Sequence, residues 1–100
     1  MEFKFVRADS TISLTLEYNE FPVYTTTLDV QTFNNDLIAL KNRITTESDE
    51  DFVANYGNYI FGYDSNRVAF TIEHDNSKVM VPLEDVDNMD TVVEFLDSLN

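Results

Sequence analysis

Apolar and polar residues alternate over two segments of the first 18 residues with the two-residue period of β-strands. The clearest case is the segment 11–18, where every second residue is apolar and the intervening residues are polar or charged. The residues expected to face the interior are Ile12, Leu14, Leu16 and Tyr18. A shorter strand is predicted at 3–7 and a third at 22–28, where Pro22 suits a strand start or an edge strand.

The middle of the chain changes to a helical period. Four apolar residues recur at steps of four, three and four, which places them on one face of a helix predicted over 32–44. They are Phe33, Leu37, Leu40 and Ile44. Ser48 is followed by three acidic residues, a pattern typical of a helix start, so a short helix is predicted over 49–56. Gly57 is expected to end that helix.

Three further strands are predicted at 58–63, 67–74 and 78–83, separated by two turns rich in aspartate, serine and asparagine. A last helix is predicted over 87–99. The order is therefore three strands, a helix, a short helix, three strands and a helix. This order predicts one α+β domain, residues 1–100, in which the helices pack on a single antiparallel sheet of five to six strands.

The composition adds a strong negative charge. The chain has 19 acidic and six basic residues, for a formal net charge of −13. Residues 1–46 hold six acids and four bases, a net charge of −2, whereas residues 47–100 hold thirteen acids and two bases, a net charge of −11. Phosphate-binding surfaces need clustered lysine and arginine, so direct binding to DNA, RNA or an anionic membrane is disfavoured. The charge favours attraction to cationic protein surfaces.

The last predicted helix carries its acids opposite its apolar face. Its carboxylates step by three, four and three residues: Asp87, Asp90, Glu94 and Asp97. They form a stripe about 15 Å long. Because like charges at this spacing weaken a helix, a helix selected only for solubility would intersperse lysine with them. The stripe is therefore either the solvated face of an acidic protein or a recognition surface for a cationic groove.

The rest of the second half supplies more candidates for such a surface. Acids gather after the first helix, in two turns and before the last helix: Glu47, Asp49, Glu50, Asp51, Asp64, Asp75, Glu84 and Asp85. Tyr59 and Tyr63 lie among them in the sequence, and tyrosine is a favoured anchor at protein interfaces. Packing in the core is the alternative role for both tyrosines.

The sequence offers little for catalysis, metal binding or a cofactor. Cysteine is absent, His74 is the only histidine, and no motif sets a nucleophile beside a base. The acids at 85, 87 and 90 lack the glycine and glutamate positions of a calcium loop. We therefore expect no enzyme activity, no metal and no cofactor. No apolar run has the length of a transmembrane helix, and the N-terminal alternation is unlike a signal peptide, so we expect a cytoplasmic protein.

A short, cysteine-free, strongly acidic α+β chain with carboxylates on one side resembles the small counter-defence inhibitors of phages, which include anti-CRISPR and DNA-mimic proteins. The resemblance covers the whole chain as a profile of length, charge and secondary structure, and no motif carries it. It implies an inhibitor whose acidic face occupies the positively charged nucleic-acid channel of an effector nuclease.

Two other classes stay open. A bacterial immunity protein or antitoxin is also small and acidic, and it blocks a basic toxin nuclease through the same kind of surface. In both classes of inhibitor, the expected partner is a basic protein that processes nucleic acid. A self-associating structural protein of a phage or mobile element is the third class, and the uncharged segment 22–28 is then the edge through which a homodimer would form.

Overall fold

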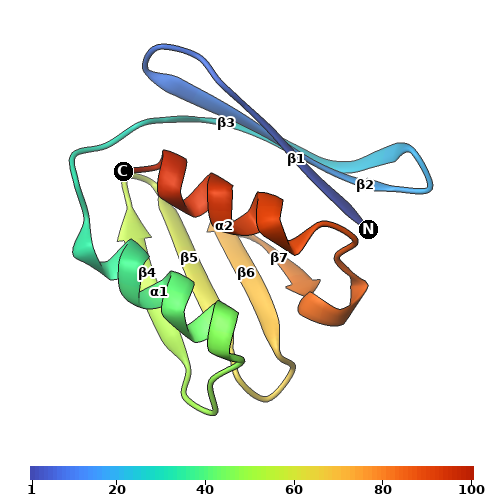
Figure 1. Ribbon diagram of the computed structural model, residues 1–100. Coiled ribbons are helices and arrows are strands. Elements are labelled where there is room, and N and C mark those ends of the chain that lie inside the picture. The colour runs from blue at the N-terminus through green and yellow to red at the C-terminus, as the bar shows by residue number, and fades with distance from the viewer.

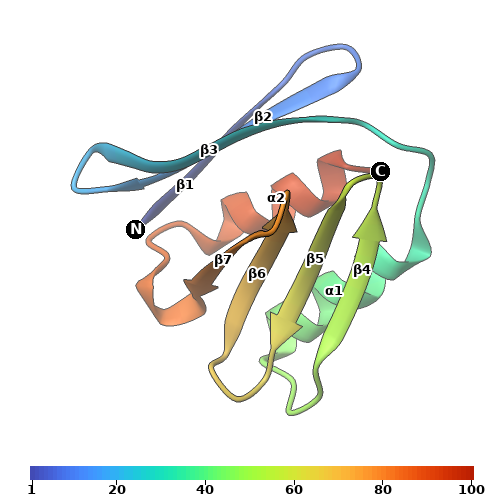
Figure 2. The same cartoon turned by 180° about the vertical axis from the view of Figure 1, so that it is seen from behind.

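The computed structural model describes residues 1–100. In chain order its elements are β1 (Glu2–Arg7), β2 (Thr11–Tyr18), β3 (Phe21–Asp29), α1 (Asn35–Thr46), β4 (Phe52–Tyr56), β5 (Tyr59–Asp64), β6 (Ala69–His74), β7 (Ser77–Pro82), the short 3-10 helix η1 (Leu83–Asp85) and α2 (Met89–Ser98). β1 to β3 form one antiparallel sheet and β4 to β7 form a second, each in sequence order. Figure 1 shows α2 between the two sheets, and Figure 2 shows both helices on one face of the larger sheet.

The α+β class is confirmed, whereas the prediction of one sheet of five to six strands is wrong. β3 pairs only with β2, and the chain then crosses to α1 without joining the second sheet. The sheets meet through α2, where the ring of Phe95 lies 5.3 Å from that of Phe3 in β1 and 5.9 Å from that of Phe61 in β5. A helix with a broad apolar face can pack against two sheets at once, which the order of strands along the sequence does not reveal.

The segment predicted as a short helix over 49–56 is mostly a strand, β4. Its more buried residues alternate along the chain: Phe52, Ala54 and Tyr56. β4 and β5 are joined by a two-residue turn at Gly57 and Asn58, and Gly57 has φ +60°, a left-handed conformation that suits glycine. The acids that suggested a helix start belong to the preceding turn, where Ser48 Oγ accepts a hydrogen bond from the amide of Glu50 (3.0 Å).

The helix α1 begins three residues after its predicted start. Asn34 takes the N-cap position, and its side-chain oxygen accepts a hydrogen bond from the amide of Asp36 (2.8 Å). Phe33 therefore lies outside the helix and is 65% exposed, although the sequence placed it on the apolar face. The other three residues of that face are buried as predicted: Leu37, Leu40 and Ile44.

The other strands lie within two residues of their predicted ranges, with two local differences. Tyr18 is 56% exposed and does not face the core, because it is the last residue of β2 and lies at the β2–β3 turn. Val68 precedes β6 with φ 48°, a conformation that is rare for a β-branched residue. Its carbonyl accepts a hydrogen bond from the amide of Leu83 (3.0 Å), which fastens the β5–β6 turn to η1.

Candidate functional site

The thirteen acids of residues 47–100 fall into two groups according to whether a basic group lies within 4.0 Å. Six are paired: Glu50 with Arg43, Asp64 with Arg67, Glu73 with Lys78, Asp75 with His74, Asp87 with the Met1 amino group, and Asp97 with Lys41. Seven exposed carboxylates have no such partner: Glu47, Asp49, Asp51, Glu84, Asp85, Asp90 and Glu94. These seven residues are called the acidic face below.

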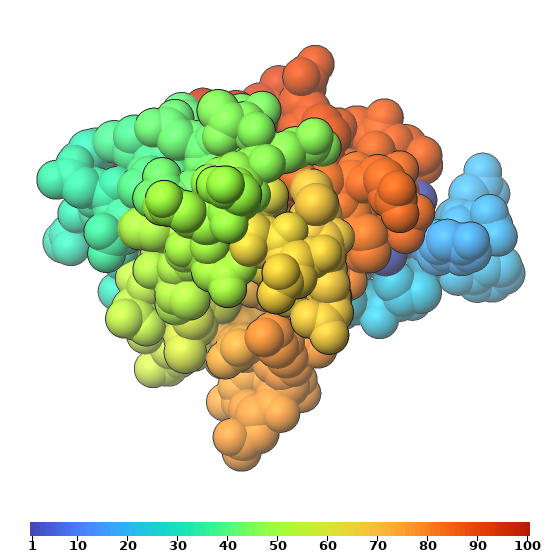
Figure 3. Space-filling view, turned by 90° about the horizontal axis from the view of Figure 1, so that it is seen from below, coloured from blue at the N-terminus to red at the C-terminus, as the bar shows by residue number.

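Three residues of the acidic face line an open hollow of about 290 Å³ between the end of α1, η1 and the start of α2. Each of these elements contributes one carboxylate to the lining: Glu47, Glu84 and Asp90. Apolar side chains make up half of the lining: Ile44, Leu83, Met89 and Val93. Figure 3 looks onto this side of the molecule, where the end of α1 (green), the β5–β6 turn (yellow) and η1 (orange) come together. Such a hollow suits a lysine or arginine side chain, which has an apolar stem and a charged head.

The loop between α1 and β4 brings further acids to the same side. Burial raises the pKa of Tyr63, and the charges of four nearby carboxylates raise it further: Glu47, Asp51, Asp49 and Asp64. The amide of Ser65 donates a hydrogen bond to Asp51 (2.7 Å), which places the loop acids beside the β5–β6 turn. Because Glu47 also lines the hollow, the loop acids are continuous with those of η1 and α2.

Two aspartates of this region also hold the β5–β6 turn in place. Asp51 Oδ1 accepts hydrogen bonds from the hydroxyl and the amide of Ser65, both 2.7 Å, and these bonds lower the pKa of Asp51. Asp64 Oδ1 accepts from the amides of Arg67 (3.2 Å) and Asn66 (3.0 Å), and the bond from the Arg67 backbone is the main cause of its lowered pKa. Both carboxylates therefore keep their charge to lower pH than an ordinary aspartate.

The predicted stripe on the last helix is only partly present at its start. The helix α2 begins at Met89, so Asp87 lies before it. Asn88 is the N-cap residue, but its side chain pairs with the backbone of Phe3 through bonds of 3.1 and 2.8 Å and leaves the helix end without a side-chain cap. Asp87 lies 3.4 Å from the amino group of Met1, so its charge is partly balanced.

The stripe is also interrupted at its other end. Asp97 lies on α2, but its carboxylate is bound at 2.7 Å by Lys41 of α1, the neighbouring helix. Asp90 and Glu94 remain as an unpaired couple one helical turn apart. The acidic face therefore depends on these two residues together with acids from η1 and the α1–β4 loop, and not on a single helix.

Tyr59 and Tyr63, the expected interface anchors, are both buried, so this part of the prediction is wrong. The hydroxyl of Tyr63 donates to the carbonyl of Ser48 (2.7 Å) and fixes the loop that carries the acids. The hydroxyl of Tyr59 donates to the carbonyl of Thr27 in β3 (3.3 Å), and its ring stacks on His74 at 4.0 Å. Both tyrosines serve the fold, and Tyr59 links the two sheets.

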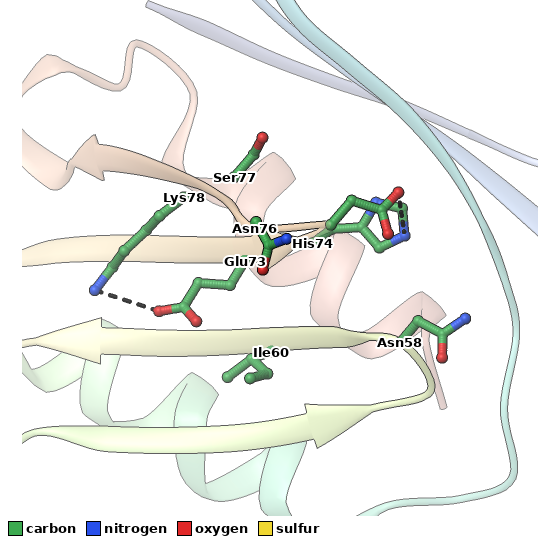
Figure 4. Close-up of a pocket in the computed structure, with 8 residues that line it drawn as sticks. Asn58, Ile60, Glu73, His74, Asn76, Ser77 and Lys78 are labelled. Atoms are coloured by element: carbon green, nitrogen blue, oxygen red, sulfur yellow. Dashed lines mark ion pairs between the residues drawn. The ribbon is translucent and has the colours of Figure 1, made fainter.

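Asp75 lies far from the acidic face, at the β6–β7 turn. This turn and the β5–β6 turn stand at opposite ends of β6, about 20 Å apart. A separate hollow of about 370 Å³ lies beside it, where His74 approaches Asp75 at 3.6 Å and Glu73 forms an ion pair with Lys78 at 3.4 Å (Figure 4). Each carboxylate that lines this hollow has a basic side chain within 4.0 Å, unlike the carboxylates of the acidic face.

A third hollow, of about 380 Å³, lies beside the β2–β3 turn and is not indicated by the sequence pattern. Its lining includes four carboxylates and one aromatic ring: Glu2, Glu17, Glu20, Asp87 and Tyr18. Asp87 makes this hollow a neighbour of the acidic face, since it follows Asp85 by two residues. The sequence signal that could have found it is the pair of acids before and within the turn, Glu17 and Glu20, which the low net charge of residues 1–46 conceals.

Glu47 occupies a position that glycine would suit better. It ends α1 with φ 47° and ψ 54°, and the amides of Glu47 and Ser48 donate to the carbonyls of Ile44 (3.3 Å) and Arg43 (3.0 Å). Glycine is the usual residue at this left-handed position, and a negative charge is unfavourable at a helix C-terminus. Replacing Glu47 with glycine is therefore expected to raise the free energy of unfolding by about 1–2 kcal/mol, measured by chemical denaturation.

The control for this prediction is Glu47→Gln, which removes the charge but keeps a side chain at the left-handed position. Its gain should be smaller, about 0.3–1 kcal/mol, because only the interaction with the helix dipole changes. Equal gains for the two variants would attribute the whole effect to charge and contradict the argument from the backbone.

Further observations bear on the class of protein. No group of three or more acidic or histidine side chains is arranged so that it could hold a metal ion. Neither α-helix combines the length and the apolar character that crossing a membrane requires. Comparison of the chain with models of protein families, with characterised proteins and with solved structures gave no match.

Proposed function

We propose that this protein is an inhibitor that binds the positively charged nucleic-acid-binding surface of an effector nuclease and blocks it by occlusion. The observation that carries the proposal is the acidic face, seven exposed carboxylates from three parts of the chain with no basic group within 4.0 Å. Gathering like charges opposes folding. A cationic surface on a partner supplies the counter-charges that the protein itself does not place there.

The shape of the face favours charge recognition. Its carboxylates come from a loop, a 3-10 helix and an α-helix around an apolar-lined hollow, so they can meet several basic side chains at once. Electrostatic attraction of this kind speeds association and weakens steeply with ionic strength. In this proposal, the protein matches the charge of a nucleic acid without matching the pattern of its bases, performs no catalysis and acts in the cytoplasm.

The proposal includes two biological settings that share one surface. An anti-CRISPR or DNA-mimic protein blocks a defence nuclease, and an immunity protein or antitoxin blocks a toxin nuclease. Both require a basic nucleic-acid groove on the partner and an acidic face on the inhibitor. The identity of the enzyme captured by the protein distinguishes the two settings.

Self-association through the edge of β3 is opposed by several features of that edge. Pro22 has no amide to donate, and the pairing of β2 with β3 shifts between Leu16 and Glu17, which places a bulge in the strand. The carbonyl of Thr27 already accepts the hydroxyl of Tyr59. Prolines, bulges and occupied backbone groups protect an edge from strand addition, so we do not propose a homodimer through residues 22–28.

The experiment that tests the proposal is a pull-down from a native-host lysate that has been treated with nuclease to remove nucleic acid. At about 0.01 M salt the screening length is about 30 Å, whereas at 1 M it is about 3 Å. We expect a basic nucleic-acid enzyme to be retained at low salt and released at high salt. Retention of no basic protein, or retention that is independent of salt, would contradict the proposal.

A further inference from the structure

The tip of the β2–β3 hairpin presents paired aromatic side chains to solvent. Tyr18 is 56% exposed and Phe21 is 74% exposed, and the two residues are cross-strand partners that close the turn. Figure 1 shows this hairpin end projecting beyond α2, and Figure 3 shows it standing out from the body of the molecule (blue to cyan). Exposed aromatic rings next to each other on a small domain are characteristic of an interaction site.

The surroundings of these rings define the chemistry of what can bind there. Tyr18 lines the hollow of about 380 Å³ that also contains four carboxylates: Glu2, Glu17, Glu20 and Asp87. Lys4 approaches Glu17 at 2.9 Å and Glu2 at 4.0 Å, and the Met1 amino group lies 3.4 Å from Asp87. Glu20 has no basic group within 4.0 Å and sits in the turn between the two aromatic residues.

We propose that Tyr18 and Phe21 bind an arginine side chain of the same basic partner, beside the acidic face. This inference rests on the proposed function. A guanidinium group stacks on aromatic rings and is attracted by carboxylates, so one arginine uses both features of the hairpin tip. Asp87 joins this hollow to the acidic face, so one partner surface can cover both regions.

Other occupants fit these surroundings less well. An uncharged apolar segment would cover the rings but would leave the carboxylate of Glu20 without a counter-charge. A second copy of this chain would bring another net charge of −13 to the same place. Lysine carries the charge but lacks the planar group that stacks, so the site should distinguish arginine from lysine.

The test uses two defined probes, nona-arginine and nona-lysine peptides, titrated calorimetrically into the folded protein at low salt. The wild-type protein should bind the arginine peptide about two- to fivefold more tightly, the range expected of one exposed cation–π contact. The double variant Tyr18→Ala, Phe21→Ala should lose this preference while its affinity for the lysine peptide stays the same. Phe33→Ala, which removes a similarly exposed ring from the connection after β3, at the other end of that strand from the hairpin tip, should keep the preference.

The outcomes separate this inference from the proposed function. If both peptides bind in a salt-dependent manner but equally well, or if the double variant keeps the arginine preference, the hairpin site is refuted and the acidic face stands. If neither peptide binds, the acidic face itself does not recognise cations, and both proposals fail. NMR amide spectra during the titration provide a second readout, because the arginine peptide should shift the resonances of the β2–β3 turn.

Discussion

Replacing Phe95 with alanine is expected to lower the free energy of unfolding by about 3–5 kcal/mol, the range for a fully buried phenylalanine. Phe95 has no exposed surface, and its ring centre lies 5.3 Å from that of Phe3, 5.7 Å from that of Phe5 and 5.9 Å from that of Phe61. The cavity would therefore open where α2 holds the two sheets together. Because small domains are stable by only about 5–15 kcal/mol, a large part of the native stability would be lost.

The measurement is chemical denaturation followed by circular dichroism, with Phe33→Ala as the matched control. Phe33 is 65% exposed and lies outside α1, so its truncation should change the free energy of unfolding by less than about 0.5 kcal/mol. A loss below about 1 kcal/mol for Phe95→Ala would show that the site collapses around the smaller side chain and that the packing of α2 does not determine stability.

The strands that alternate over six or more residues could be predicted from the sequence, because their pattern is local. Residues 12, 14 and 16 of β2 are buried as expected, and the neighbouring strands lie close to their predicted ranges. The exception is β4, a strand of five residues. Its alternation is too short to outweigh the serine and acids before it, which form a turn in the structure although they match a helix start.

The division into two sheets could not be predicted, because it depends on contacts between distant parts of the chain. Local pattern identifies strands but does not tell which strands pair after a helix intervenes. The alternation that includes Phe3 and Phe5 would be the same in one large sheet and in a separate small sheet that packs on a helix. The packing of Phe95 between β1 and β5 distinguishes these arrangements.

The negative charge of the candidate site could be predicted from the sequence, but which acids remain unpaired and form the site could not. The excess of acid after residue 46 is visible in the sequence, but the pairing of Asp97 with Lys41 joins residues 56 positions apart. The tyrosines show the same limit, since Tyr18 and Tyr59 both lie in segments that the sequence predicts as strands. Tyr59 is buried where the two sheets meet, and Tyr18 is exposed where a hairpin extends past the core.

Two glutamates in left-handed backbone conformations support the proposed function. Glu20 has φ 69° in the β2–β3 turn, and Glu47 has φ 47° at the end of α1, positions where glycine or asparagine is less strained. Glu47 lines the hollow of the acidic face, and Glu20 lines the neighbouring hollow at the hairpin tip. Strained residues persist where function requires them at some loss of stability, and in the proposed function the requirement is a carboxylate presented to a cationic partner.

Reversing three charges of the acidic face is expected to abolish most of the affinity for a basic partner. The variant replaces Glu47, Glu84 and Asp90 with lysine, one residue from each element around the hollow. Like charges placed opposite each other across an interface cost several kcal/mol, so the Kd should rise about 100- to 1,000-fold. The measurement is calorimetric titration with the enzyme recovered by pull-down, at about 0.15 M salt so that long-range attraction is screened.

The matched control reverses three exposed acids outside the acidic face: Asp9, Asp29 and Asp75. Each reversal adds two charges, so both variants change the formal net charge by six, from −13 to −7. The control should lose less than about tenfold in affinity, because at this salt concentration only charges within about 8 Å interact strongly. Both variants should remain folded, since every substituted side chain is exposed and the overall repulsion falls. Equal losses for the two variants would show that net charge alone attracts the partner and that the hollow between α1, η1 and α2 is not where it binds.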